Sequence, residues 1–264
     1  MKIKANGIEM NYELTGEGNC LVLIHGFGDN LHMWFNQVPE FSKKYRVLTY
    51  DIRGFGGTEM IKGPYSMGLF ADDLYELLGV LGIKSACVLG HSLGGGIGLE
   101  LAIGHPEMVK GLIFANSGVA VPRTPQVQEH FKMMIEVLQK GDIEIVAEAL
   151  VLSGLSPGFK EKDPITFKKY KEIKMRNNPS AMLALMKGMA PGSVVPPDLS
   201  RLRCPVLIIA GENDIAMPAS GVEQMKSVLK GAMSKVLPTG HGAPIEAPKE
   251  FNQVVFDFLK GLGW

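Results

Sequence analysis

Residues 90–94, with the sequence Gly-His-Ser-Leu-Gly, place a serine between two glycines, after an apolar run and before a helix-like segment. A nucleophile at a sharp strand-to-helix turn takes strained backbone angles, and side chains two residues before and after it would collide there. The pattern G-x-S-x-G meets this requirement, and the turn exposes the hydroxyl above the sheet. We therefore predict that Ser92 is a nucleophile, with a purely structural turn serine as the competing interpretation.

A serine hydroxyl is a poor nucleophile without a general base, and the chain has six histidines. His241 lies between two glycines in a loop that follows a strand-like segment at 233–237. Ligand sites of open α/β sheets lie at the carboxyl ends of the strands, which favours His241 as the base. His91 is adjacent to the serine, but neighbours on a strand point to opposite faces, so we expect it to pack under the turn. We expect His25 to support a loop.

The base of such a site needs a carboxylate that orients its ring. Glu212 and Asp214 follow another strand-like run and therefore reach the same edge of the predicted sheet. We predict that Asp214 has this role, with Glu212 as the weaker candidate and a turn aspartate before a helix as the alternative interpretation. Serine, aspartate and histidine then follow one another in the order expected when a strand-to-helix turn of an α/β sheet carries the nucleophile.

A second glycine-rich stretch, His-Gly-Phe-Gly at 25–28, follows an apolar strand-like run. Its glycines let the backbone fold inward, so we predict that the Phe27 amide is one donor of an oxyanion hole. The Leu93 amide, at the start of the helix after the serine, is predicted as the other donor. A glycine-rich loop also suits phosphate, but neither G-x-x-x-x-G-K-[ST] nor a properly spaced G-x-G-x-x-G occurs, so no nucleotide site is expected.

The elements that must position these residues are near-continuous apolar runs rather than alternating ones. Such runs are typical of parallel strands covered on both faces, and they occur at 20–28, 45–54, 85–92, 109–117 and 204–214. Helix-like segments lie between them, for example at 69–81, and a hairpin with an Asn-Gly turn is predicted at 2–14. The alternation predicts an α/β fold with an open, doubly wound sheet.

This alternation breaks between residues 119 and 198, where no convincing parallel strand occurs. Helix start signals replace it, at Asp142, Asp163-Pro164 and Asn178-Pro179. We predict a core domain formed by residues 1–118 and 199–264, with a helical cap inserted at 119–198.

The composition excludes several classes of partner. Lysine plus arginine and aspartate plus glutamate both number 27, so neither nucleic acid nor an anionic membrane is expected as a partner. Three widely spaced cysteines, Cys20, Cys87 and Cys204, indicate buried reduced thiols rather than a disulfide framework or a metal site. No run approaches the roughly 20 apolar residues of a membrane span, and the N-terminus lacks the apolar core of a signal peptide, so we expect a cytoplasmic location.

The chain resembles the α/β-hydrolase superfamily along its whole length. The resemblance depends on five motifs in order: HGFG at 25–28, DIRGFGGT at 51–58, GHSLGG at 90–95, GENDIAMP at 211–218 and GHGAPIEAP at 240–248. It implies an eight-stranded, mostly parallel sheet with an antiparallel second strand, an inserted helical cap, and no cofactor or metal. Asp51 and Arg53 are expected to tie a strand to a loop.

Several subfamilies remain open. Haloalkane dehalogenases and related epoxide hydrolases use an aspartate nucleophile, which the serine at position 92 disfavours. Hydrolases of carbon–carbon bonds often have asparagine before the serine and tryptophan after the histidine, where this chain has His91 and Gly242. Arg176 is a candidate contact for an acidic substrate. The competing interpretation is a solvated basic face formed with Lys168, Lys169, Lys171 and Lys174.

The predicted function is a cofactor-independent serine hydrolase that cleaves carboxylic esters of small to medium apolar acids through an acyl-enzyme. Its expected partner is a small-molecule, ester-like substrate. A carbon–carbon bond hydrolase, an enol-lactonase and a perhydrolase are alternatives within the resemblance. A ligand-sensing protein with slow turnover and an inactive interaction protein are alternatives of other classes.

Overall fold

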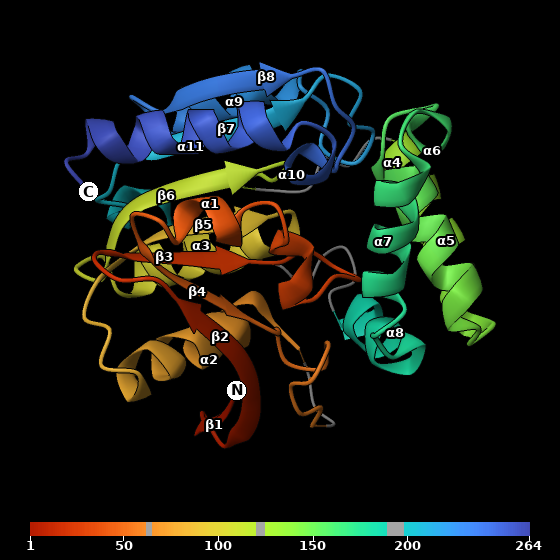
Figure 1. Cartoon of the computed structure of the whole chain (residues 1–264), viewed down its shortest axis with the longest axis horizontal. Helices are drawn as coiled ribbons and strands as arrows, with labels where there is room; N and C mark the ends of the chain where they lie inside the picture. Colours follow the sequence, from red (N-terminus) through yellow and green to blue (C-terminus); the bar gives the residue numbers. More distant parts are fainter. Residues whose placement is uncertain (62–64, 120–124, 189–197) are drawn as a thin grey trace.

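The computed structural model describes residues 1–61, 65–119, 125–188 and 198–264, without the side chains of residues 126, 127 and 130 (Figure 1). Within these residues, eight strands form one sheet in the order β1-β2-β4-β3-β5-β6-β7-β8. The strands are β1 Lys2–Ala5, β2 Ile8–Thr15, β3 Cys20–Ile24, β4 Arg46–Tyr50, β5 Ala86–His91, β6 Val109–Ala115, β7 Val206–Gly211 and β8 Met233–Leu237.

The sheet is antiparallel at one edge only. β1 and β2 form the predicted hairpin, and Asn6 and Gly7 both take positive φ angles of 46° and 78°, as a tight two-residue turn requires. β2 pairs antiparallel with β4, and every pair from β4 to β8 is parallel. The predicted α/β-hydrolase sheet is therefore confirmed.

Two helical layers cover the sheet and explain the near-continuous apolar runs. Alternate residues of β3 enter different cores, with Val22 and Ile24 in one and Leu21 and Leu23 in the other. Helices α2 (Met67–Val80), α3 (Leu93–Gly104) and α9 (Gly221–Val228) contribute to the first core. Helices α1 (Val38–Phe41) and α11 (Pro248–Gly261) contribute to the second core. Since both faces are buried, polar alternation is absent from these strands.

Among the described residues, five α-helices lie between β6 and β7 in the chain: α4 Pro125–Gln139, α5 Ile143–Gly154, α6 Phe159–Lys162, α7 Pro164–Lys174 and α8 Pro179–Gly188. They form a separate group beyond the ends toward which the parallel strands point (Figure 1). The Asp142 and Asp163 carboxylates cap α5 and α7 as predicted. We refer to this group as the cap; its exact boundaries at 119 and 198 stay a prediction. None of the helices among the described residues is both long and apolar enough to cross a membrane.

Candidate active site

Ser92 occupies the sharp turn between β5 and α3. Its backbone takes φ 50° and ψ −115°, an uncommon conformation for a residue with a side chain. Its amide donates to the Ala115 carbonyl of β6 at 3.0 Å, which holds the turn against the neighbouring strand. A Cβ atom on Gly90 would fall on the Gly94 backbone, and one on Gly94 would fall on the Ile24 carbonyl. The steric reason for both glycines therefore matches the structure.

The predicted oxyanion loop, residues 25–28, lies directly against this turn. A Cβ atom on Gly26 would be 2.6 Å from His91 Nδ1 and 3.2 Å from Ser92 Cβ, so only glycine fits. Phe27 is the next residue along the chain. Leu93 is the first residue of α3, where a helical amide has no partner within the helix. The structure thus places both predicted donor residues beside Ser92, and their role as oxyanion donors stays a prediction.

Asp214 and His241 are in direct contact. His241 Nδ1 donates to Asp214 Oδ2 at 2.8 Å. The other carboxylate oxygen accepts from the Ala216 and Met217 amides at 2.9 and 2.8 Å. Burial raises the pKa of Asp214, but the nearby His241 ring and these donors outweigh it, so the pKa is lowered and the carboxylate stays charged. The weaker candidate, Glu212, is exposed to solvent.

Asn116 is a site residue that the sequence reasoning missed. It follows β6, is buried, and adopts a φ of 48°. Its amide group donates to Asp214 Oδ2 at 3.0 Å and to the Gly240 carbonyl at 3.1 Å. One side chain therefore holds both the carboxylate and the loop of His241. The sequence does contain one indication of this role, because Asn116 follows a buried strand and ligand sites of open α/β sheets lie at the carboxyl ends of the strands.

Ser92 directly follows His91, whose ring centroid lies 5.1 Å from that of His241. In the neutral His241 ring, Nδ1 carries the hydrogen of the bond to Asp214, so Nε2 is an acceptor, as a general base requires. Among the described residues, the Ser92 hydroxyl makes no hydrogen bond to this ring. Such bonds often form or shorten only when substrate binds. The neighbouring His91 ring nevertheless donates from Nε2 to the His241 carbonyl at 2.8 Å, so the two loops are tied together.

His25 supports a loop, as expected, and the buried His91 ring lies between Gly26 and the loop of His241. Burial and the nearby His241 lower the pKa of His91 to about 4, so its ring is neutral at pH 7. With Nε2 donating to His241, His91 Nδ1 is an acceptor and has no hydrogen-bond partner among the described residues. The fully buried His25 accepts from the Ile52 amide through Nε2 at 2.9 Å, which joins the oxyanion loop to the end of β4.

Asp51 and Arg53 hold loops together, as the motif at 51–58 implies. Asp51 accepts from the Leu31 and Gly57 amides, both at 2.7 Å. The Arg53 guanidinium forms an ion pair with the Asp73 carboxylate of α2, and both side chains are buried. Both Asp51 and Arg53 follow the carboxyl end of β4 and hold it to neighbouring segments of the chain.

The predicted basic face of the cap is wrong at one position. Arg176 and Lys168 are exposed, in keeping with a solvated surface. Lys174, in contrast, is only 4% exposed, and its Nζ lies 2.6 Å from Asp29 Oδ1. The helical periodicity of α7 turns this lysine away from the exposed basic face and toward the core.

Comparison with known proteins places the chain in a family. The family model described as alpha/beta hydrolase fold matches residues 19–248. The chain is 28% identical over 261 residues to 3-oxoadipate enol-lactonase 2 of Acinetobacter baylyi, with 98% of this chain and 96% of that protein covered. It is similar to the crystal structure of the enol-lactonase from Burkholderia xenovorans, with TM-score 0.90, 25% identity, and 98% of this chain and 100% of that chain covered.

A thermophilic esterase from Thermogutta terrifontis has a similar structure, with TM-score 0.87, 28% identity, and 99% of this chain and 98% of that chain covered. The family match covers most of the chain, and these relatives are named as hydrolytic enzymes. The chain therefore belongs to the α/β-hydrolase fold family and is a hydrolase of that fold.

Proposed function

We propose that the protein is a cofactor-independent serine hydrolase that cleaves carboxylic esters of small to medium apolar acids. The observation that carries this proposal is the 2.8 Å contact between Asp214 and His241. His91, the residue before Ser92, binds the backbone carbonyl of His241 and so connects this pair to the turn of Ser92. A charged, buried carboxylate keeps the proton on Nδ1 of the His241 ring, and the free Nε2 can take the proton of a serine.

In the proposed reaction, His241 removes the hydroxyl proton while Ser92 Oγ attacks the ester carbonyl carbon. The Phe27 and Leu93 amides stabilise the oxyanion, and each such donor lowers the barrier by roughly 3 kcal/mol. The alcohol leaves with the proton from His241, which produces an acyl-enzyme. Water then releases the acid, with His241 first as base and then as acid.

Apolar cap residues beside the two loops support an apolar acyl group. A Cβ atom on Gly28 would lie 2.6 Å from Leu150 and 3.1 Å from Met182. The Leu155 side chain packs in the same manner on Gly242. Aliphatic and methionine side chains of the cap therefore contact the oxyanion loop and the loop that carries His241. A methionine side chain is flexible and adapts to ligands of different shape.

A lactone is an internal ester, so an enol-lactonase is the second candidate function. It is favoured by the names of the Acinetobacter baylyi and Burkholderia xenovorans relatives, both of which are matched over nearly their whole length. The same three side chains would open the ring, and the leaving oxygen would remain attached to the acyl group. A cytoplasmic location and a small-molecule, ester-like substrate stay parts of this proposal.

The test is steady-state turnover of p-nitrophenyl esters of increasing chain length, an enol-lactone and a ring-cleavage dione. We expect rapid multiple turnover of short and medium esters, and a loss of about 10⁶-fold in Ser92→Ala, on the order of the loss when the nucleophile of a triad is removed. Ser227→Ala, at an exposed serine of α9, is the matched control. Unchanged turnover in Ser92→Ala would refute the proposal, and a single slow turnover would favour the ligand-sensing alternative.

A further inference from the structure

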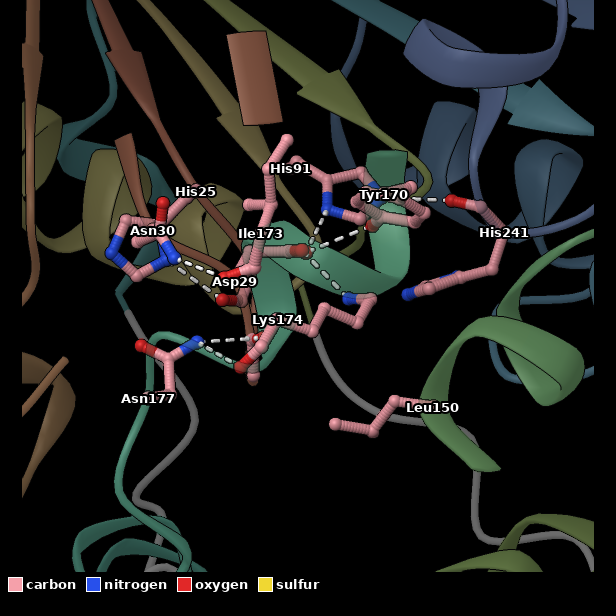
Figure 2. Close-up of polar contacts among 12 residues, drawn as sticks. His25, Asp29, Asn30, His91, Leu150, Tyr170, Ile173, Lys174, Asn177 and His241 are labelled. Carbon is pink, nitrogen blue, oxygen red and sulfur yellow. Dashed lines mark hydrogen bonds and ion pairs between the residues drawn. The ribbon is translucent and has the colours of Figure 1, made fainter. Parts of the chain in front are cut away.

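The end of cap helix α7 contacts the residues that follow the oxyanion loop. The Lys174 ammonium binds Asp29 Oδ1 at 2.6 Å, and the Tyr170 hydroxyl donates to Asp29 Oδ2 at 3.1 Å. Asn177 donates to the Gly28 carbonyl at 2.9 Å, and Asn30 donates to the Ile173 carbonyl at 2.7 Å. Figure 2 shows Asp29 and Lys174 between His25 and His241, with Asn30 and Asn177 on the side of His25. We call these four hydrogen bonds the α7 contact.

Every polar side chain of the α7 contact is buried. Asp29 and Asn30 are 1% exposed, and Lys174, Tyr170 and Asn177 are between 3% and 7% exposed. Neither charge of the Lys174–Asp29 pair has water as an alternative partner, so separating the pair is costly. A buried ion pair contributes little net stability against an apolar replacement. This pair joins the last residue of α7 to the segment that follows the oxyanion loop.

The α7 contact lies next to both loops of the candidate site. Asp29 is two residues after Phe27, and Gly28 between them takes a φ of 72°. The other carboxylate oxygen of Asp29 lies 4.0 Å from His91 Nδ1. His91 in turn binds the His241 carbonyl. A movement of the cap would therefore displace Asp29 and, with it, the adjoining oxyanion loop.

The start of the oxyanion loop is held by the core domain, because His25 Nδ1 donates to the Gly26 carbonyl at 2.8 Å and the Phe27 ring packs edge-on against Phe55. The loop contains Gly26 and Gly28, which have more conformational freedom than any other residue type. Its carboxyl-terminal end is held by the cap through Gly28, Asp29 and Asn30, all of which take part in the α7 contact. Fixing these three residues limits the orientations open to the Phe27 amide.

We propose that Lys174 is a positioning residue, which anchors the cap to Asp29 and thereby holds the Phe27 amide in place for the oxyanion. This inference rests on the proposed function, since it uses the predicted role of that amide. It makes correct docking of the cap a condition for catalysis, and not only for enclosing the substrate. A donor displaced by about 1 Å costs on the order of 100-fold in rate.

The test compares Lys174→Met with a double variant and a control. The double variant, Lys174→Met with Asp29→Asn, removes the tie without leaving an unpaired buried carboxylate, so it carries the test if the single variant does not fold. The control is Lys171→Met, which removes a cation of the same helix that binds Glu148 at 2.8 Å inside the cap. Thermal unfolding reports on the stability of each variant.

Two rates are measured for each protein. The first is labelling of Ser92 by a small alkyl fluorophosphonate, in which the Oγ–P bond forms, the P–F bond breaks, fluoride leaves and the serine proton passes to His241. The second is turnover of p-nitrophenyl butyrate, expressed as kcat per labelled site. Normalisation to labelled sites removes the effect of any unfolded fraction.

We expect both Lys174 variants to lower kcat per site and the labelling rate by about 10-fold to 100-fold, with KM within about threefold of wild type. Lys171→Met is expected to stay within about twofold on both rates. Wild-type rates per site in the double variant, or a raised KM with unchanged kcat, would overturn the proposal. If wild-type protein is labelled at Ser92 but turns over no ester, only the proposed function is refuted, because the labelling rates still test the role of Lys174. If wild-type protein is not labelled at Ser92, both proposals are refuted.

Discussion

Nε2 of His91 lies 2.8 Å from the carbonyl oxygen of His241, although the two residues are 150 positions apart in the chain. The residue beside the nucleophile thus holds the loop that carries the base. This bond requires a hydrogen on His91 Nε2. Because the pKa of His91 is lowered, the ring is neutral at pH 7 and its Nδ1 is unprotonated.

His91 makes stability dependent on pH. Its pKa falls from an ordinary 6.5 to about 4 in the folded protein, first because of burial and then because of His241. The unfolded chain therefore binds this proton at higher pH than the folded chain does, and the stabilisation present above pH 6.5 is lost as the pH falls toward 4. For this group the loss reaches about 3 kcal/mol.

Urea unfolding at pH 7.5 and pH 4.5 tests this prediction. We expect the free energy of unfolding to fall less steeply in His91→Gln than in wild type, since glutamine does not titrate. The buried His25, whose pKa is also lowered by burial, is present in both proteins and cancels from the comparison. Parallel pH dependences in the two proteins would show that folding does not lower the pKa of His91.

Asp214→Asn is expected to lower kcat by about 10⁴-fold, because an amide does not hold His241 in the required tautomer. Glu212→Gln, two residues earlier and exposed, is the matched control and should retain wild-type kcat. The measurement is ester turnover per labelled Ser92. Equal losses in the two variants would contradict the assignment of Asp214.

Asn116→Gly removes the amide that joins Asp214 to the Gly240 carbonyl. Glycine accepts the φ of 48° at this position, so the effect of the lost hydrogen bonds is separated from backbone strain. We expect kcat to fall about 10-fold, on the order of one charge-assisted hydrogen bond, with KM unchanged. An effect on KM alone would assign Asn116 to the substrate pocket instead.

Gly26→Ala tests the close approach of the oxyanion loop to the nucleophile. The added methyl group would overlap His91 and press on Ser92 Cβ, so we expect kcat to fall by about 100-fold. Gly79→Ala in α2, where a Cβ atom meets nothing within 4 Å, is the control. It should retain activity and gain about 0.5–1 kcal/mol of stability. Activity assays and urea unfolding measure both effects, and an active Gly26→Ala enzyme would contradict the packing.

Much of the fold is predictable from the sequence because its signals are local. Burial on both faces forces apolar residues at every position of β3 and at the first four positions of β5, and the sharp turn forces glycine two residues before and after Ser92. Strand ends of a parallel sheet share one edge, so Asp214 and His241 could be placed together before any coordinates were known. Helix starts at Asp142 and Asp163 were visible for the same local reason.

The tertiary structure decided the contacts that join distant segments. No local pattern around Asn116 or Lys174 reveals its partner. Asn116, after β6, binds the loop after β8, and Lys174 of α7 binds Asp29, so both bonds depend on how whole elements pack. The sequence determined which side chains reach the catalytic edge of the sheet. The packing of the cap decided that one lysine of a basic helix is buried on Asp29 instead of exposed to water, because only there is its charge paired.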